Sequence, residues 1–213
     1  MSRDLVVIGA GGFGRETLDV AEAAIRAGAG FRILGVIDGS PSEHNLQRLE
    51  ARGIAYLGTE AHWLAGQPNS VEYVIGVGSP AAKEIIANRF DSAGLSAATL
   101  IHPMAAIGTM ARIGPGSVVC GGVQISTNVH TARHVHVNPG AIIGHDAVID
   151  EFASVNPGAV ISGEVHLGKG SLIGAGAVVL QGLWVGQGAT VGAAACVVRE
   201  VAPGVVVKGV PAR

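Results

Sequence analysis

The C-terminal half of the chain carries an aliphatic residue at every sixth position. From residue 107 to residue 197, fifteen of the sixteen positions spaced by six are Ile, Leu or Val, and Thr131 is the exception. Alanine is frequent two residues before these positions and glycine directly after them, as at Ala141, Ile143 and Gly144. A period of six residues over this length is typical of a parallel β-helix, in which each repeat supplies one short strand and one corner.

The period also predicts how the repeats pack. Three repeats close one triangular coil of about eighteen residues, so residues that far apart in sequence stack on one another. The aliphatic side chains point inward, alanine fits the narrow interior, and glycine permits tight corners. One coil cannot bury its own core, so stability comes from stacking about five coils. The segment 202–213, APGVVVKGVPAR, leaves the period and is expected to pack back as a C-terminal tail.

The N-terminal half has different periods, typical of alternating strands and helices. Apolar runs that end in glycine or in an acid predict strands starting at residues 5, 31 and 71. Helical spacing of apolar residues follows the first and third of them, over 15–28 and 81–90. We therefore expect a small Rossmann-like α/β domain over 1–98, a β-helix over 99–201 and the tail over 202–213.

The composition excludes several classes of function. The 14 basic and 16 acidic residues give a net charge of −2, so no nucleic-acid partner is expected. The sequence pattern predicts no signal peptide and no apolar run of membrane-spanning length, so no membrane partner is expected either. The two cysteines, Cys120 and Cys196, have no ligand or disulfide spacing and fit reduced thiols. These features predict a cytoplasmic protein.

Three stretches together with the repeat resemble one group of enzymes. VVIGAGGFGRETLDV and VID in the first half and VVVKGVPAR at the end occur beside the hexapeptide period. The chain resembles the sialic-acid O-acetyltransferases and the UDP-4-amino-sugar N-acetyltransferases of the bacillosamine type. The resemblance implies a left-handed β-helix and a homotrimer whose active sites lie between subunits. It also implies acetyl-CoA as co-substrate, bound in grooves between adjacent β-helices.

A histidine–aspartate pair interrupts the apolar stretch AIIGHDAVID at 141–150. His145 comes two residues after the inward Ile143, so we expect it at an outward corner. Histidine has the basicity to take a proton from an attacking amine or hydroxyl, and a neighbouring carboxylate strengthens it and selects its tautomer. The resemblance assigns catalysis to His145 and Asp146, with Asp146 replacing the Glu usual in some members.

A G-x-G-x-x-G motif formed by Gly9, Gly11 and Gly14 follows the first predicted strand, and Asp38 ends the second. Alone, this pattern is typical of NAD binding, although 98 residues offer one mononucleotide half of such a site. Glycines that merely allow strand–helix packing are the alternative. The resemblance instead assigns contacts with the sugar acceptor, and Phe13 stands where the family commonly has His or a polar residue. The assigned acceptor contacts are Gly9, Gly11, Gly12, Phe13, Asp38, Gly78 and Asn138.

Stacking predicts the surroundings of His145. Gly163 lies eighteen residues after it, where a backbone N–H can stabilise the oxyanion of the tetrahedral intermediate. Ser154 stands where some relatives carry a second His, and its hydroxyl can still form a hydrogen bond. The contacts assigned to acetyl-CoA are Ser154, Gly163, Ala175, Ala193 and Lys208.

Two other histidines resemble part of a metal site. His130 and His166 are 36 residues apart, as in the zinc ligands of gamma-class carbonic anhydrases, but the third ligand position holds Ser171. Three protein ligands are expected of a catalytic zinc, so no metal is predicted. Residues 130, 148, 166 and 184 are instead predicted to form an outward column at the trimer contact.

The prediction is an acetyl-CoA-dependent acetyltransferase that acts on an amino sugar, with the 4-amino group of a nucleotide-linked sugar as acceptor. The alternatives left open are a sugar O-acetyltransferase of the sialic-acid type, a non-catalytic β-helix assembly protein and an NAD-dependent enzyme. The same base serves N- and O-acetylation, so the sequence alone names neither the sugar nor the atom acetylated.

Overall fold

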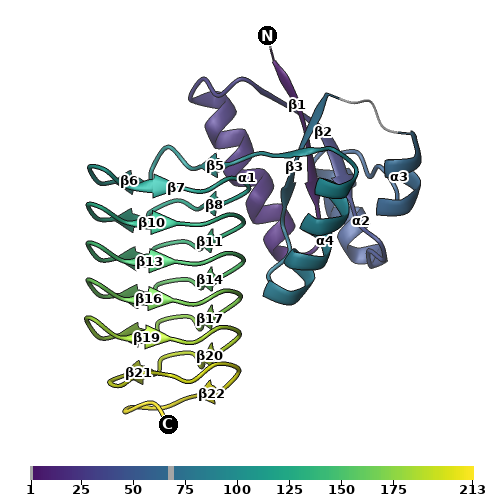
Figure 1. The fold of residues 1–213 in the computed structure, drawn as a ribbon. Coiled ribbons are helices and arrows are strands. Elements are labelled where there is room, and N and C mark those ends of the chain that lie inside the picture. The colour runs from purple at the N-terminus through teal and green to yellow at the C-terminus, as the bar shows by residue number, and fades with distance from the viewer. Residues whose placement is uncertain (1, 67–69) are drawn as a thin grey trace. The chain divides into compact units, whose positions relative to one another are not determined.

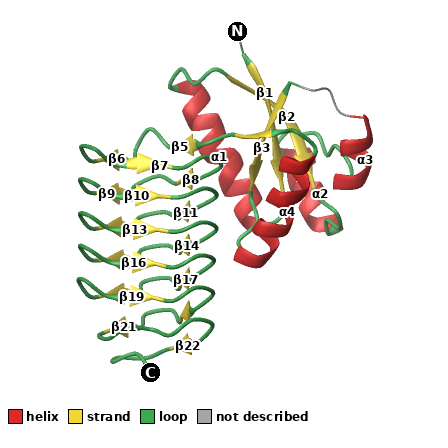
Figure 2. Cartoon of the chain, in the orientation of Figure 1, coloured by secondary structure: helices red, strands yellow, loops and turns green. Residues whose placement is uncertain are grey.

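The computed structural model describes residues 2–66 and 70–213, which form two compact units that divide after Leu100 (Figure 1). The first unit alternates helices and strands, whereas the second consists of very short strands joined by turns (Figure 2). This is the predicted combination of an α/β unit and a parallel β-helix, and the predicted fold class is confirmed. In the described part of the chain, no helix has the length and apolar content needed to cross a membrane.

The first unit is built on one parallel sheet with the strand order β2-β1-β3-β4. The predicted strands are present, and the first predicted helix starts three residues earlier than expected, at Gly12. Two further helices, α2 and α3, lie in a region for which the sequence analysis predicted no element. The elements are β1 (Arg3–Ile8), α1 (Gly12–Arg26), β2 (Phe31–Ile37), α2 (Glu43–Ala51), α3 (Glu60–Gly66), β3 (Val71–Ile75), α4 (Pro80–Ser92) and β4 (Ser96–Ala97).

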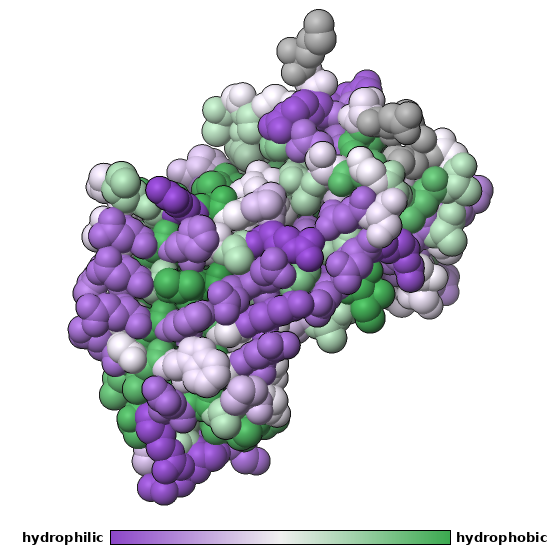
Figure 3. Space-filling model, in the orientation of Figure 1, coloured by the Kyte–Doolittle hydropathy of each residue, from purple (hydrophilic) through white to green (hydrophobic). Residues whose placement is uncertain are grey.

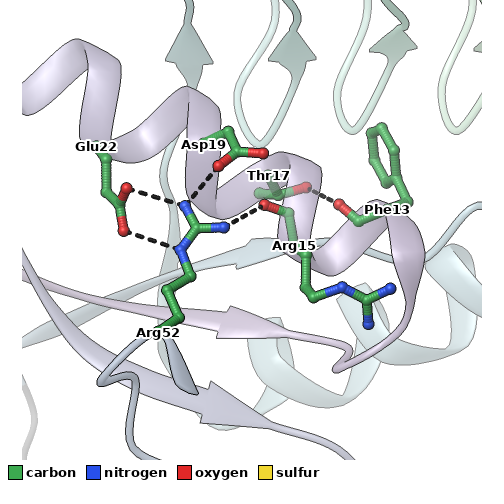
Figure 4. A network of polar contacts seen from close by, with 6 residues as sticks. All are labelled: Phe13, Arg15, Thr17, Asp19, Glu22 and Arg52. Carbon is green, nitrogen blue, oxygen red and sulfur yellow. Dashed lines mark hydrogen bonds and ion pairs between the residues drawn. The ribbon is translucent and has the colours of Figure 1, made fainter. Parts of the chain in front are cut away.

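An arginine at the end of α2 fastens that helix to α1. The Arg52 guanidinium donates to Asp19 at 2.6 Å and to Glu22 at 2.9 Å (Figure 4). It also donates to the backbone oxygen of Arg15 at 3.3 Å, so three acceptors along α1 hold one side chain. The network holds the part of α1 that begins within the glycine motif, since Gly14 lies in the first turn of this helix.

Three glycines let the backbones of β1, α1 and the loop after β3 approach closely. A Cβ on Gly14 would lie 1.8 Å from the Gly9 oxygen, and one on Gly76 would lie 2.6 Å from the Gly14 Cα. Gly9 also has a φ of 111°, a conformation that side chains other than glycine rarely adopt. These glycines are therefore required by packing.

Eighteen residues separate hydrogen-bonded partners throughout the second unit, as the period predicts. Ile143, for example, pairs with Ile125 on one side and with Ile161 on the other. The strands fall into three parallel sheets. The five-strand sheet contains β7 (Arg112–Ile113), β10 (His130–Thr131), β13 (Val148–Ile149), β16 (His166–Leu167) and β19 (Trp184–Val185). The six-strand sheet contains β6 (Ala106–Ile107), β9 (Gln124–Ile125), β12 (Ile142–Ile143), β15 (Val160–Ile161), β18 (Val178–Val179) and β21 (Cys196–Val197). The seven-strand sheet contains β5 (Leu100–Ile101), β8 (Val118–Val119), β11 (His136–Val137), β14 (Ser154–Val155), β17 (Leu172–Ile173), β20 (Thr190–Val191) and β22 (Val206–Val207).

The interior of the β-helix is filled by the residues that the period selects. Ile143 and Ile161 are 1% and 0% exposed, and the alanines at 141 and 147 are fully buried. Ile107, in the first coil, is still 38% exposed because no complete coil precedes it. Beyond residue 201, where the sequence predicts a tail, β22 pairs with β20 and extends the seven-strand sheet.

We predict that Gly14→Ala destabilises the first unit, because its Cβ would overlap the Gly9 carbonyl. Overpacking of this kind costs about 2 kcal/mol, which corresponds to about 30-fold faster hydrogen exchange of the β1 amides. Gly12→Ala is the matched control, since a Cβ there meets no atom within 4 Å. Equal exchange rates in the two variants would contradict the packing role.

Candidate active site

The His145–Asp146 pair lies at the corner between β12 and β13, where the chain passes from the six-strand to the five-strand sheet. The imidazole Nδ1 and the Asp146 Oδ2 are 2.7 Å apart, so the shorter Asp side chain reaches the ring. The two side chains are 49% and 46% exposed. The pair thus projects outward from the coil, as expected from its place in the repeat.

Backbone hydrogen bonds hold this corner between the neighbouring coils. The Asp146 N–H donates to the Thr127 oxygen at 3.1 Å, and the Glu164 N–H donates to the His145 oxygen at 2.8 Å. Asp146 has a φ of 59°, in the left-handed region that Asp and Asn tolerate better than most side chains. The corner is therefore fixed from both sides along the stack.

The second carboxylate oxygen of Asp146 is bound by a residue of the preceding coil. The Asn128 side-chain amide donates to Asp146 Oδ1 at 2.9 Å. Hydrogen bonds first from His145 and then from Asn128 lower the pKa of Asp146 below its ordinary value. The carboxylate is therefore ionised at neutral pH. An ionised carboxylate can only accept a hydrogen bond, so the Nδ1 that faces it carries the proton. This selects the tautomer in which Nε2 has a free lone pair.

Gly163 lies directly against the His145 ring. A Cβ on Gly163 would be 2.5 Å from His145 Nε2, so this position requires glycine for the observed ring orientation. The prediction that residues eighteen apart stack therefore holds for this pair. The Nδ1 edge of the ring faces Asp146, and the Nε2 edge lies against the backbone of Gly163, which has no side chain.

Asn128 is a residue of this site that was not predicted from the sequence. Asn128 lies one coil before Asp146. Because residues one coil apart stack, the stacking rule could have indicated a contact between this amide and this carboxylate. The six-residue period predicted the outward corner for His145, but a partner for Asp146 in the preceding coil was not considered.

Other predicted site residues lie elsewhere on the single β-helix. Asn138, Ala175 and Ala193 follow strands of the seven-strand sheet, at the row of corners on the far side of β12 from His145. Asn138 is 7% exposed and donates to Asn156 Oδ1 at 3.0 Å. Ser154 is buried within β14, and Lys208 is exposed just after β22. One chain by itself does not bring these residues together with His145.

The first unit has a pocket of about 370 Å³ at the carboxyl ends of its strands. The chain leaves β1 for β2 on one side of it and returns to β3 on the other, and ligands of parallel sheets bind at such a point. The residues around the pocket are Ile8, Gly9, Asp38, Gly39, Ser40, Glu60, Val77 and Ile86.

Asp38 holds the loop beside this pocket. Its Oδ2 accepts the Ala10 N–H at 2.7 Å, and its Oδ1 accepts the Ser40 N–H at 2.9 Å. The predicted acceptor glycines divide into two kinds. Gly9 packs against Gly76, whereas a Cβ on Gly11, Gly12 or Gly78 would meet no atom within 4 Å. Those three glycines therefore border open space, and Phe13 directly follows Gly12 in the first turn of α1.

The column predicted from residues 130, 148, 166 and 184 is present in the five-strand sheet. His130, Val148, His166 and Trp184 pair in register. His166 Nε2 lies 2.9 Å from Asp150 Oδ2, so this histidine has a carboxylate partner. Within residues 2–66 and 70–213, no group of three or more His, Cys, Asp or Glu side chains is placed to hold a metal ion.

Comparisons with known proteins match the first unit to a family model and the whole chain to solved structures. Residues 4–90 match the family model described as the PglD N-terminal domain. The chain is 29% identical to GDP-perosamine N-acetyltransferase of Escherichia coli O157:H7 over 151 aligned residues. The aligned residues make up 70% of this chain and 65% of that protein. The alignment thus spans slightly less than two thirds of the curated relative.

Solved structures match the whole chain. The acetyltransferase domain of PglB from Neisseria gonorrhoeae FA1090 is 30% identical, with 100% of this chain and 99% of that domain covered and a TM-score of 0.85. The same domain has been solved in complex with acetyl coenzyme A. PerB from Caulobacter crescentus, solved with CoA and GDP-perosamine, shares the fold at 24% identity, with coverage of 99% and 96% and a TM-score of 0.88.

We predict that His145→Ala raises the pKa of Asp146 toward its ordinary value, because the hydrogen bond that most lowers it is lost. The lowered pKa stabilises the fold above about pH 4, and this contribution disappears as the pH falls through the folded-state pKa. Carboxyl ¹³C NMR titration of Asp146 measures the shift. Met110→Ala, two coils away in the same row of corners, is the control. An unchanged titration in His145→Ala would refute the pairing.

Proposed function

The chain belongs to the PglD-type hexapeptide-repeat N-acetyltransferases, and from this premise we propose that it transfers the acetyl group of acetyl-CoA to the 4-amino group of a nucleotide-linked sugar. The observation that carries the proposal is the His145–Asp146 pair, fixed at a corner with its Nε2 edge over Gly163. The name of the curated relative, GDP-perosamine N-acetyltransferase, supports an amine rather than a hydroxyl as the atom acetylated.

His145 is the general base of the proposed reaction. The neutral amine of the sugar attacks the thioester carbonyl of acetyl-CoA, and His145 Nε2 takes a proton from that nitrogen as the new C–N bond forms. The resulting tetrahedral oxyanion collapses, the C–S bond breaks, and the CoA sulfur leaves and is protonated to the thiol. Asp146 stabilises the imidazolium that exists between these events. The Gly163 N–H is the proposed donor to the oxyanion.

The acceptor and the coenzyme occupy different surfaces in this proposal. Gly11 and Gly12 border open space at the start of α1, where N–H groups and the helix dipole favour phosphate, and Gly78, after β3, also borders open space. We assign the nucleotide part of the acceptor to this region, with Gly9, Phe13 and Asp38 beside it, and assign Asn138 to the sugar. Acetyl-CoA contacts are assigned to Ser154, Gly163, Ala175, Ala193 and Lys208.

We propose a homotrimer, and the placement of these residues supports it. Asn138, Ala175 and Ala193 lie on a different row of corners from His145, so we infer that a neighbouring subunit completes the site. Large apolar side chains are exposed on the β-helix. Figure 3 shows hydrophobic residues, in green, at the surface among hydrophilic ones, in purple. Apolar surface of this kind is typical of subunit contacts. The exposed side chains include Met104, Ile142, Trp184 and Val206.

The alternatives make different demands on the site. A non-catalytic assembly protein would not need a hydrogen bond between His145 and Asp146, nor a glycine at position 163 against the ring. An NAD-dependent enzyme would need a dinucleotide to fit at a four-strand sheet. A sialic-acid O-acetyltransferase would use the same base, so the acceptor assay must separate it from the N-acetyltransferase.

We predict that the wild-type chain releases CoA thiol from acetyl-CoA when given a nucleotide-linked 4-amino sugar. The assay uses GDP-, UDP- and dTDP-linked 4-amino sugars and free sialic acid as acceptors. His145→Ala should lower kcat by about 10²- to 10⁴-fold, the usual contribution of a general base. Light scattering should give the mass of three chains for both proteins, because the corner is not part of the buried core.

His62→Ala, on helix α3 of the first unit, is the control for a histidine substitution outside the proposed site. Near wild-type turnover in His145→Ala would contradict the assignment of the base. Thiol release with sialic acid alone would instead favour O-acetylation, and a single-chain mass would contradict the shared site.

A further inference from the structure

The pairing of His145 with Asp146 is not enforced by the backbone. The two residues are neighbours in sequence, and both side chains are about half exposed. A half-exposed carboxylate that is bound at one oxygen only can rotate toward water. A second hydrogen bond, to the other oxygen of Asp146, would oppose this rotation and so help to keep the ring oriented.

Asn128 is in the position to do this. Its Nδ2 donates to Asp146 Oδ1 at 2.9 Å, while the other oxygen, Oδ2, lies 2.7 Å from the His145 Nδ1. The carboxylate is thus bound at both oxygens, and its rotation would break one of the two hydrogen bonds. Asn128, Asp146 and His145 form a chain of hydrogen bonds that runs along the stack.

Asn128 is itself anchored. Its N–H donates to the Thr109 oxygen at 3.0 Å, and that same oxygen accepts the Thr127 hydroxyl at 2.8 Å. Its φ of 58° places it in the same corner conformation as Asp146, one coil later. Since both residues sit at equivalent positions of neighbouring coils, the short amide and the short carboxylate meet directly.

The same corner position carries other side chains in the remaining coils. Met110, Glu164 and Gly182 also have positive φ there, at 60°, 61° and 69°. None of these side chains pairs an amide donor with a carboxylate of the next coil among the described residues. The Asn128–Asp146 contact is therefore specific to the coils that carry His145 and is not a general feature of the corner.

We propose that Asn128 is a positioning residue, which holds Asp146 so that Asp146 accepts from His145 Nδ1 and leaves Nε2 as the base. The proposal rests on the proposed function, since it assigns Asn128 a part in the chemistry of that site. Asn128 acts through Asp146 and touches no reacting atom.

The test measures the tautomer of His145 directly and does not require turnover. In chain labelled with [¹⁵N]histidine, the ring nitrogen shifts at about pH 8.5 report which nitrogen carries the proton. Loss of one signal set in His145→Gln assigns His145 among the eight histidines. We expect Nδ1–H to dominate in the wild type and a mixture of tautomers in Asn128→Gly and Asn128→Asp.

The variants separate positioning from folding. Glycine accepts the positive φ of Asn128 without strain, and aspartate keeps the shape but replaces the donor by an acceptor. Met110→Gly is the matched control at the same corner position and should keep the wild-type tautomer. In the acetyltransferase assay, both Asn128 variants should lower kcat about tenfold, which is less than the 10²- to 10⁴-fold contribution of the general base itself, and should leave KM for acetyl-CoA unchanged.

Each outcome decides the proposal. An Nδ1–H tautomer that persists in Asn128→Gly, an equal change in Met110→Gly, or a wild type without the Nδ1–H preference would overturn it. A tautomer change confined to the Asn128 variants supports it, even if no acceptor is ever acetylated. Absence of turnover with an intact tautomer effect would refute the proposed function and leave the positioning role standing.

Discussion

Parallel backbone hydrogen bonds between residues eighteen positions apart determine where every outward side chain of the β-helix points. The stack is filled by aliphatic side chains that have no alternative place, so a shift of one residue would turn the core outward. This register puts Asn128, Asp146 and Glu164 at equivalent corners, and it puts Gly163 against the ring of His145. A polar cluster on an exposed corner is ordered because the apolar interior fixes the backbone beneath it.

Glycine has a comparable part in the first unit, with a different purpose at each position. Gly9, Gly14 and Gly76 allow three backbone segments to cross at distances that no side chain would permit. Gly11 and Gly12 border open space at the start of a helix, where a phosphate can approach the backbone. Asp38 accepts N–H groups from the loop after β1 and from its own loop after β2, and so holds the second loop in shape. One motif thus contains glycines needed for packing and glycines that leave room.

The sequence was sufficient for much of this structure because a period of six residues has few physical solutions. It located the strands, the inward aliphatic and alanine positions, and the outward corner of His145. The α2 and α3 helices were not predicted, and the contact of Arg52, directly after α2, with Asp19 and Glu22 on α1 depends on a part of the fold that is distant in sequence. Asn128 was not predicted because its role depends on a hydrogen bond to Asp146, which lies one coil away. The division of the glycine motif also depends on distances between backbones that are far apart in sequence.

The central claim is that the stack holds His145 Nε2 as the base for an amine that attacks acetyl-CoA. A crystal structure of the assembled protein with CoA and a nucleotide-linked 4-amino sugar tests it most directly, through the distance between the sugar amine and Nε2. The account predicts a distance of about 2.6–3.2 Å, in hydrogen-bonding range. An amine held by another side chain, with Nε2 beyond the reach of a direct or water-mediated hydrogen bond, would contradict it.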